Sequence, residues 1–396
     1  MTPWQGMGPD LANYLDTAAT TPPAAAVLEA MRNAQTQGWA NPSSLHGFGL
    51  KAAEQLERSR STVARCLDCP TEAVVFTSGG TEAIHLAILG ATEALQPGRL
   101  LISAVEHPAA TAAAERLRQR GWEIGVVPVN GEGLIDLPVL ESLLVPPTRM
   151  VSLIWGQNEV GSLQPIEAVG QLCRRRQVLL HVDAVQVVGK VPLAFMPLPV
   201  DLLSCAAHKF MGPRGIGALL VRPGVPLVSQ LGGGGQEAGL RAGTEPVPLA
   251  VGMAQALELA VERFASASEP LGPLEQLRNA LLERLLQLPG VRLCGPPPGP
   301  QRLPHHISLL LRGANDAPLS GRAVLRRLAA QGLAVSSGSA CSSTGRGASP
   351  VLEAMGFGPE VAASGLRISL GPWHGPGLLD TVPAALATAM AAEGIG

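Results

Sequence analysis

Lysine is almost absent from this chain of 396 residues. Lys51, Lys190 and Lys209 are its three lysines, so arginine supplies nearly all of the 29 basic residues. A reaction that needs a lysine amine therefore has three candidates. Lys51 belongs to a charged helical stretch, and Lys190 lies in a predicted turn, so both are weaker candidates than Lys209.

A strong net charge and a long apolar run are also missing. The chain has 29 Lys and Arg against 31 Asp and Glu, a net charge of −2. This excludes the basic field that holds nucleic acid or an anionic membrane. No apolar run approaches the roughly 18 residues of a membrane span. The N-terminus lacks a basic region followed by an apolar run, so we expect no signal peptide.

Cysteine is scarce, with six residues in the whole chain. This number is too small for a disulfide framework at this length, which favours a reducing compartment and predicts a cytoplasmic protein. Cys66 and Cys69 have the spacing of a zinc-binding pair. No second pair accompanies them, so we expect no metal site.

Seven short apolar runs alternate with helical stretches over the first 221 residues. Near-continuous apolar strands joined by helices are typical of an α/β domain, whose mostly parallel sheet is covered on both faces. The predicted strands are residues 73–77, 99–103, 123–127, 150–155, 178–183, 201–205 and 217–221.

The pattern changes after the glycine run at residues 232–235. Two long amphipathic helices are predicted at residues 249–264 and 274–288. A smaller α+β region follows, with a strand at 306–311 and a helix at 321–331. The predicted domains are a large one over residues 14–254 and a small C-terminal one over residues 255–396 together with 1–13.

Several reactive side chains follow these strands, and ligands of α/β proteins bind at the carboxyl ends of parallel strands. Ser78-Gly-Gly-Thr81 opens a helix and suits a phosphate, although an ordinary helix N-cap explains the same residues. Asp183 and Gln186 suit a cationic ring nitrogen and a phenolic oxygen, with a helix-capping aspartate as the alternative. Lys209 suits a Schiff base, although a lysine at such a position is more often structural. His107 lies on the same rim and suits stacking on a planar cofactor.

Two more residues stand out in the C-terminal region. Cys341 lies in a loop of small polar residues, where an exposed thiol can act as a nucleophile. Arg367 lies in an apolar strand and needs an anionic partner, which a substrate carboxylate would provide. His85, His305 and His306 are interpreted as ordinary helix or strand-edge residues.

Together, these motifs resemble the cysteine desulfurases of the NifS/IscS type, pyridoxal-phosphate enzymes of the class-V aminotransferase superfamily. The resemblance covers nearly the whole chain, from Tyr14 to Gly371. Its motifs are Tyr14-Leu-Asp-Thr-Ala-Ala-Thr-Thr-Pro22, Asn41-Pro-Ser-Ser44, Thr77-Ser-Gly-Gly-Thr-Glu82, Glu106-His107, Gln157-Asn-Glu-Val-Gly161, His181-Val-Asp-Ala-Val-Gln186, Ala207-His-Lys209, Arg241-Ala-Gly-Thr244, residues 336–342 and Arg367.

The resemblance implies fold type I of the pyridoxal-phosphate enzymes and a role for each matching residue. Lys209 corresponds to the Schiff-base lysine, Cys341 to the nucleophile, and His107 to a histidine that stacks on the cofactor ring and moves protons. The other matching residues hold the cofactor or the substrate: Gly80, Thr81 and His208 at the phosphate, Thr244 at the phosphate of the partner subunit, Asn158, Asp183 and Gln186 at the ring, and Asn41 and Arg367 at the substrate carboxylate.

The activity implied is conversion of L-cysteine to L-alanine by a homodimer. The sulfur would pass to Cys341 as a persulfide, and then to an acceptor protein such as an iron–sulfur scaffold, for the synthesis of iron–sulfur clusters or other sulfur-containing cofactors. The cofactor of this family stabilises a carbanion on the substrate Cα, and that property serves many different reactions of amino acids. A selenocysteine lyase or a C–S lyase on the same fold, or a non-enzymatic sulfur-relay subunit, therefore remain alternatives.

Three features bear on these alternatives. A phosphate-binding serine of many family members falls on Ala206, which predicts weaker cofactor binding and motivates the non-enzymatic alternative. The chain ends 25 residues after Gly371, which puts docking of a scaffold protein in doubt. The loop around Cys341 is long, as in the branch with mobile cysteines.

Overall fold

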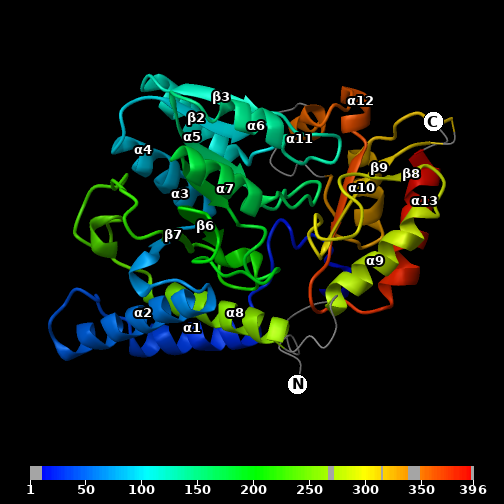
Figure 1. The fold of residues 1–396 in the computed structure, drawn as a ribbon. Coiled ribbons are helices and arrows are strands. Elements are labelled where there is room, and N and C mark those ends of the chain that lie inside the picture. Colours follow the sequence, from blue (N-terminus) through cyan, green and yellow to red (C-terminus); the bar gives the residue numbers. More distant parts are fainter. Residues whose placement is uncertain (1–10, 266–271, 314, 338–347, 394–396) are drawn as a thin grey trace.

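The computed structural model describes residues 11–265, 272–313, 315–337 and 348–393. They form two β-sheets with helices around each (Figure 1). Within these ranges, no helix is both long and apolar enough to cross a membrane.

The larger sheet has seven strands in the order β1-β7-β6-β5-β4-β2-β3. Strand β7 is antiparallel to both β1 and β6, and every other neighbouring pair is parallel. The predicted mixed, mostly parallel sheet is therefore confirmed. Its strands are β1 (Val74–Thr77), β2 (Arg99–Ser103), β3 (Glu123–Val127), β4 (Thr148–Ile154), β5 (Leu179–Asp183), β6 (Leu202–Ala206) and β7 (Gly217–Val221).

Successive side chains of these strands enter two different apolar clusters, one on each face of the sheet. Val74 and Phe76 of β1 belong to one cluster, whereas Val75 belongs to the other. This alternation is the two-residue period of a strand that is buried on both faces. The first cluster is completed by α2 (Gly47–Cys66), α6 (Leu137–Leu143), α7 (Ile166–Arg176) and α8 (Val247–Ala265), and the second by α3 (Gly80–His85), η3 (Leu86–Gly90), α4 (Ala91–Glu93) and α5 (Pro108–Gln119).

The smaller sheet is antiparallel and has the order β10-β9-β8. It has an apolar core of its own, which includes Leu15 from the N-terminal segment. This second core is the predicted smaller C-terminal domain, shown at the right of Figure 1. Its elements are β8 (Val291–Leu293), β9 (His306–Leu311), β10 (Gly365–Ser369), α9 (Pro273–Leu286), α10 (Gly321–Ala330) and α13 (Leu378–Glu393).

The predicted domain boundary at 254/255 lies within helix α8, which packs against α1 and α2. Where the boundary itself falls stays a prediction. The remaining elements are η1 (Leu11–Asn13), α1 (Ala25–Gln37), η2 (Thr71–Ala73), η4 (Ala207–Lys209), η5 (Glu237–Gly239), α11 (Pro350–Ala354) and α12 (Pro359–Ala362).

The strand directions bring the ends of β1, β2, β4, β5 and β6 to one edge of the larger sheet. These five strands run the same way, because β7 is antiparallel to β1 on one side and to β6 on the other. Their carboxyl ends therefore share one edge, which is where α/β sheets bind their ligands.

Candidate active site

Lys209 lies just after β6, in the 3-10 turn η4, and its amine points at the N-terminal segment. Lys209 Nζ donates to the carbonyl oxygens of Ala18 at 2.7 Å and Ala19 at 2.8 Å. Gln186 Nε2 donates to the same Ala18 oxygen at 2.7 Å. The structure therefore brings Lys209 and Gln186 together, as the prediction requires.

Asp183 closes β5 and is buried, with 3% of its surface exposed. Burial raises the pKa of Asp183 from 3.8 to about 6, against the opposing effects of the Val185 N–H and the positive charge of Lys209. The Val185 N–H donates to Asp183 Oδ1 at 3.0 Å, so the carboxylate also caps the turn that follows, as the alternative interpretation held. A buried carboxylate loses its hydration, and few hydrogen bonds or opposite charges offset that loss here. A cationic partner therefore stabilises it.

His107 lies directly before α5 and caps it, because His107 Nδ1 accepts the Ala109 N–H at 3.1 Å. That contact leaves the proton of the neutral ring on Nε2. Burial lowers the pKa of His107, and the positive charge of Lys209 adds to the effect. His107 is therefore a neutral ring beside Lys209 at the same sheet edge.

A cavity of about 370 Å³ opens between the end of β1 and the loop after η4. A Cβ on Gly80 would come 2.8 Å from Val185 Cγ2, so glycine allows the close approach of the two strand ends. The His208 ring also lines the cavity, and its Nδ1 lies 3.0 Å from Thr20 Oγ1. Glycine, hydroxyl and imidazole groups together suit a phosphate. The cavity is lined by Thr20, Ser78, Gly79, Gly80, Thr81, Glu82, His208, Arg214 and Gly215.

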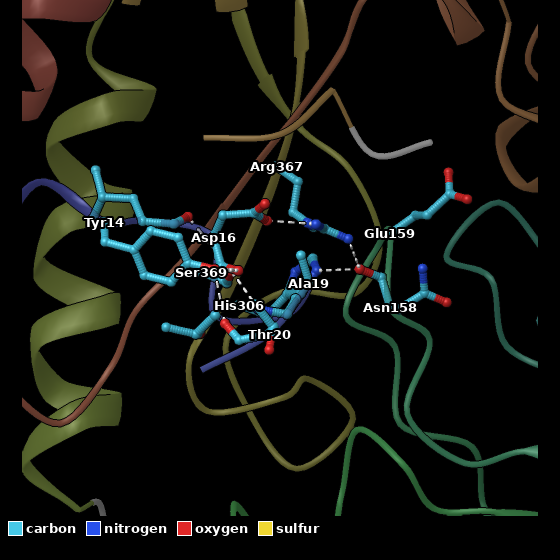
Figure 2. A network of polar contacts seen from close by, with 12 residues as sticks. Tyr14, Asp16, Ala19, Thr20, Asn158, Glu159, His306, Arg367 and Ser369 are labelled. Atoms are coloured by element: carbon cyan, nitrogen blue, oxygen red, sulfur yellow. Dashed lines mark hydrogen bonds and ion pairs between the residues drawn. The ribbon is translucent and has the colours of Figure 1, made fainter. Parts of the chain in front are cut away.

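Arg367 is buried in β10, and Figure 2 shows the polar network around its guanidinium. Arg367 Nη2 donates to Asp16 Oδ1 at 2.6 Å, and Nη1 donates to the Asn158 carbonyl oxygen at 2.9 Å. His306 Nε2 lies 3.1 Å from the same Asn158 oxygen. The sequence predicts a substrate carboxylate as the anionic partner of Arg367. In this structure, Asp16 of the same chain supplies that carboxylate. Arg367 Nε is buried and has no partner among the described residues.

Two predicted site residues, Asn41 and Thr244, do not join this group, and a third lies outside the described part of the chain. Asn41 is exposed, and its Oδ1 accepts the Ser43 N–H at 2.8 Å within its own turn. Thr244 is exposed and is absent from the lining of the cavity. Cys341 lies outside the described residues.

Sequence reasoning missed four contributors to the site. Asp16 was not singled out, since 351 residues separate it from Arg367. Lys190 was assigned to a turn, but its Nζ donates to Gln186 Oε1 at 2.8 Å. His306 was taken as an ordinary strand residue, yet it is buried against Asn158. Burial lowers the pKa of Lys190 well below its usual value, and the charges of Lys209 and Arg367 lower it further.

The fourth missed residue is Glu106, which is buried directly before His107. Glu106 Oε1 accepts the Ser103 hydroxyl at 2.5 Å and the Ile154 N–H at 2.9 Å. These contacts tie the end of β2 to the end of β4. Burial raises the pKa of Glu106 to about 8, so it is largely protonated near neutral pH.

The sequence matches the model of the class-V aminotransferases over residues 13–374. The chain belongs to this family. Within it, the relatives are cysteine desulfurases. Cysteine desulfurase IscS of Clostridium botulinum is 35% identical over 361 residues, which cover 90% of this chain and 89% of the relative. Cysteine desulfurase IscS of Methylococcus capsulatus is 39% identical over 363 residues, 90% of this chain and 87% of the relative.

Solved structures of similar proteins have the same fold. A NifS-like protein superimposes with a TM-score of 0.87 at 33% identity and covers 96% of this chain and 100% of its own. A structure of SspA in complex with cysteine has a TM-score of 0.79 at 31% identity and covers 92% of this chain and 100% of its own. The predicted resemblance and the fold type I architecture are confirmed.

Pyridoxal 5′-phosphate is the cofactor of this family, and the residues at the sheet edge fit it. The cavity offers a glycine cradle and hydroxyl groups for a phosphate. The buried Asp183 carboxylate suits a protonated ring nitrogen, and the Lys209 amine suits the aldehyde. Ala206 lies beside this cradle, 3.6 Å from the position of an added Gly80 Cβ, so a methyl group stands where the resemblance led us to expect a phosphate-binding serine.

Proposed function

We propose that this protein is a homodimeric L-cysteine desulfurase, with pyridoxal 5′-phosphate held by the residues at the sheet edge. The observation that carries the proposal is the grouping of Lys209, Asp183 and His107 after strands β6, β5 and β2, at one edge of the sheet, in a chain with cysteine desulfurases among its relatives. The products are L-alanine and a persulfide sulfur on Cys341, which is then passed to an acceptor protein such as an iron–sulfur scaffold.

The cofactor, when bound, supplies an electron sink for the electron pair left on the substrate Cα. Lys209 Nζ, held by the Ala18 and Ala19 carbonyls, would hold the aldehyde end of the cofactor and would accept or return the Cα proton. Asp183 keeps a proton on the ring nitrogen, because its buried carboxylate favours a cation beside it.

His107 and Gln186 orient the ring from two sides. The Nδ1 of His107 is occupied by the Ala109 N–H, which fixes the plane of the imidazole and leaves Nε2–H free to donate. The Gln186 amide is held by Ala18 on one atom and by Lys190 on the other. Asn158 and Gln186 are assigned to the ring, and Gly80, Thr81 and His208 to the phosphate.

Arg367 binds the substrate carboxylate in this proposal. Its buried Nε has no partner among the described residues, so an N–H is available for an external oxygen. Two N–H groups on one edge of a guanidinium match the two oxygens of a carboxylate. Asn41 is assigned to the same carboxylate.

The homodimer is supported by an exposed apolar patch on the segment between α1 and α2 and on the first turn of α2. The rings of Trp39 and Phe48 lie 5.8 Å apart, with 64% and 61% of their surface exposed. Leu45 beside them is 91% exposed. Apolar groups gathered in this way mark a surface that another protein covers. In such a dimer the exposed Thr244 would reach the phosphate of the partner subunit.

The proposal is tested with purified protein loaded with cofactor. L-Cysteine should shift the visible absorbance of the cofactor and release alanine in amounts equal to the sulfide recovered with a reductant. The variant Cys341→Ser should lose alanine formation, whereas Cys66→Ser, which changes a half-buried thiol on α2, should keep it.

Other outcomes distinguish the alternatives. Equal formation of alanine or pyruvate by Cys341→Ser would identify a lyase, and a preference for selenocysteine would identify a selenocysteine lyase. A protein that binds no cofactor would be a sulfur-relay subunit. The cytoplasmic location stays a prediction from the cysteine content.

A further inference from the structure

Gly80 lines the cavity at the end of β1, and Ala206 lies beside it, at the position where the resemblance to the cysteine desulfurases leads us to expect a phosphate-binding serine. Ala206 is 1% exposed and offers a methyl group instead of a hydroxyl donor. A phosphate monoester carries a charge of about −1.5 to −2 at neutral pH and has three strong acceptor oxygens. A cavity that binds it needs another donor in place of the missing one.

The charges around the cavity leave a cation available. Burial, together with the positive charges of Lys209, Lys190 and Arg214, lowers the pKa of His208 to about 4, so His208 is a neutral donor. Glu82 is engaged, since its carboxylate accepts Arg241 Nε at 2.9 Å and the Ser78 N–H at 2.7 Å. The negative charge of Glu82 is therefore already balanced.

Arg214 is the remaining charged group among the described lining residues. It lies between Pro213 and Gly215, in the loop that joins η4 to β7. Its side chain is exposed and makes no hydrogen bond or ion pair with any described residue. Gly215 beside it has φ of +87°, in the left-handed region that favours glycine, so the loop turns sharply at this point.

We propose that Arg214 binds the cofactor phosphate directly and takes the place of the hydroxyl that is missing at Ala206. A guanidinium suits this role, because its N–H groups match two phosphate oxygens and its charge persists at all physiological pH values. The weaker cofactor binding expected from Ala206 is then offset by an ion pair. The inference rests on the proposed pyridoxal-phosphate site, but not on the fate of the substrate sulfur.

The test is a titration of cofactor-free protein with pyridoxal 5′-phosphate, and separately with pyridoxal, which lacks the phosphate. Arg214→Met should weaken binding of the phosphorylated form by about tenfold to a hundredfold, the usual range for a charged hydrogen bond. Binding of pyridoxal should stay unchanged. Arg149→Met is the matched control, because Arg149 is equally exposed but lies at the amino end of β4, away from the cavity.

Two further variants isolate the link to position 206. Ala206→Ser restores the hydroxyl, so Arg214→Met should weaken cofactor binding less in that background than in the natural sequence. Arg214→Lys keeps the charge and should fall between the natural protein and Arg214→Met. Inorganic phosphate should compete with the cofactor in the natural protein and compete less in Arg214→Met.

Three results would overturn the proposal. In the first, Arg214→Met binds the cofactor as tightly as Arg149→Met does. In the second, it loses pyridoxal and pyridoxal 5′-phosphate equally, which indicates a general structural role. In the third, light scattering shows that Arg214→Met dissociates a dimer, which assigns Arg214 to subunit contact. If the protein binds the cofactor in a way that depends on Arg214 but forms no alanine from L-cysteine, the proposed function is refuted and the role of Arg214 stands.

Discussion

The ion pair between Arg60 and Glu237 allows a sharp prediction of stability. The Glu237 carboxylate accepts Arg60 Nη1 at 2.6 Å, Arg60 Nη2 at 2.8 Å and the Phe76 N–H at 2.8 Å. The two side chains are 10% and 2% exposed. Glu237→Leu removes the buried partner of the Arg60 guanidinium and leaves it only Glu57, at 3.1 Å and 60% exposed, so we expect the free energy of unfolding to fall by about 3–5 kcal/mol.

The matched control is Glu29→Ala, which breaks the pair between Glu29 and Arg32. These side chains are 54% and 72% exposed, so the loss should be about 0–1 kcal/mol. Urea unfolding of each variant, followed by far-ultraviolet circular dichroism, measures the difference. The double variant Arg60→Met/Glu237→Leu should lose about 1–3 kcal/mol less than the sum of its single variants, because no unpaired charge remains. Equal losses for Glu237→Leu and Glu29→Ala would refute the reasoning.

Two further predictions concern the carboxylates of Glu106 and Asp16. Because burial raises the pKa of Glu106 from 4.5 to about 8, the folded state keeps a proton that the unfolded chain has lost. The contribution to stability is full below the unfolded pKa and is lost as the pH rises toward 8, with a slope of up to about 1.4 kcal/mol per pH unit. Urea titrations of cofactor-free protein from about pH 7 to 8 should show this slope, and Glu106→Gln should remove it; an unchanged slope would contradict the assignment. Asp16→Asn leaves Arg367 without its carboxylate, so a high concentration of L-alanine should raise the melting temperature of this variant more than that of the natural protein. An equal rise in both proteins would show that Asp16 does not compete for Arg367.

Most of the larger sheet could be predicted from the sequence because its strands are short, apolar runs buried on both faces. The edge that carries Asp183 and Lys209 could be predicted for the same reason, since parallel strands present their carboxyl ends together. The strand β8 could not, because its three residues give no recognisable period. Helix α13 was also missed. It carries Pro383 inside it, and it forms because its apolar side chains pack into the core of the smaller sheet.

The parts of the site that escaped prediction depend on contacts between distant segments. Asp16 and Arg367 meet because the N-terminal segment forms a bridge with β10, where Asp16 pairs with Ser369. Nothing in the local pattern around either residue indicates this pairing. Lys190 lies in a turn, as its sequence suggests, but the sequence does not show that its amine donates to Gln186. Local patterns predict which residues lie on a strand end, whereas tertiary packing decides which of them share a hydrogen bond.

The N-terminal segment also explains how the two sheets share one site. Its Asp16 pairs with Arg367 of the smaller sheet, while its Ala18 carbonyl accepts both Lys209 and Gln186 from the larger one. Lys190 has a strongly lowered pKa beside these groups, because burial and the charges of Lys209 and Arg367 disfavour another cation. Cations therefore crowd the region where the two sheets meet. An anionic ligand that enters would relieve this repulsion. In the proposed function, the residues that raise the free energy of the empty site would therefore favour the carboxylate of an amino acid and the phosphate of a cofactor.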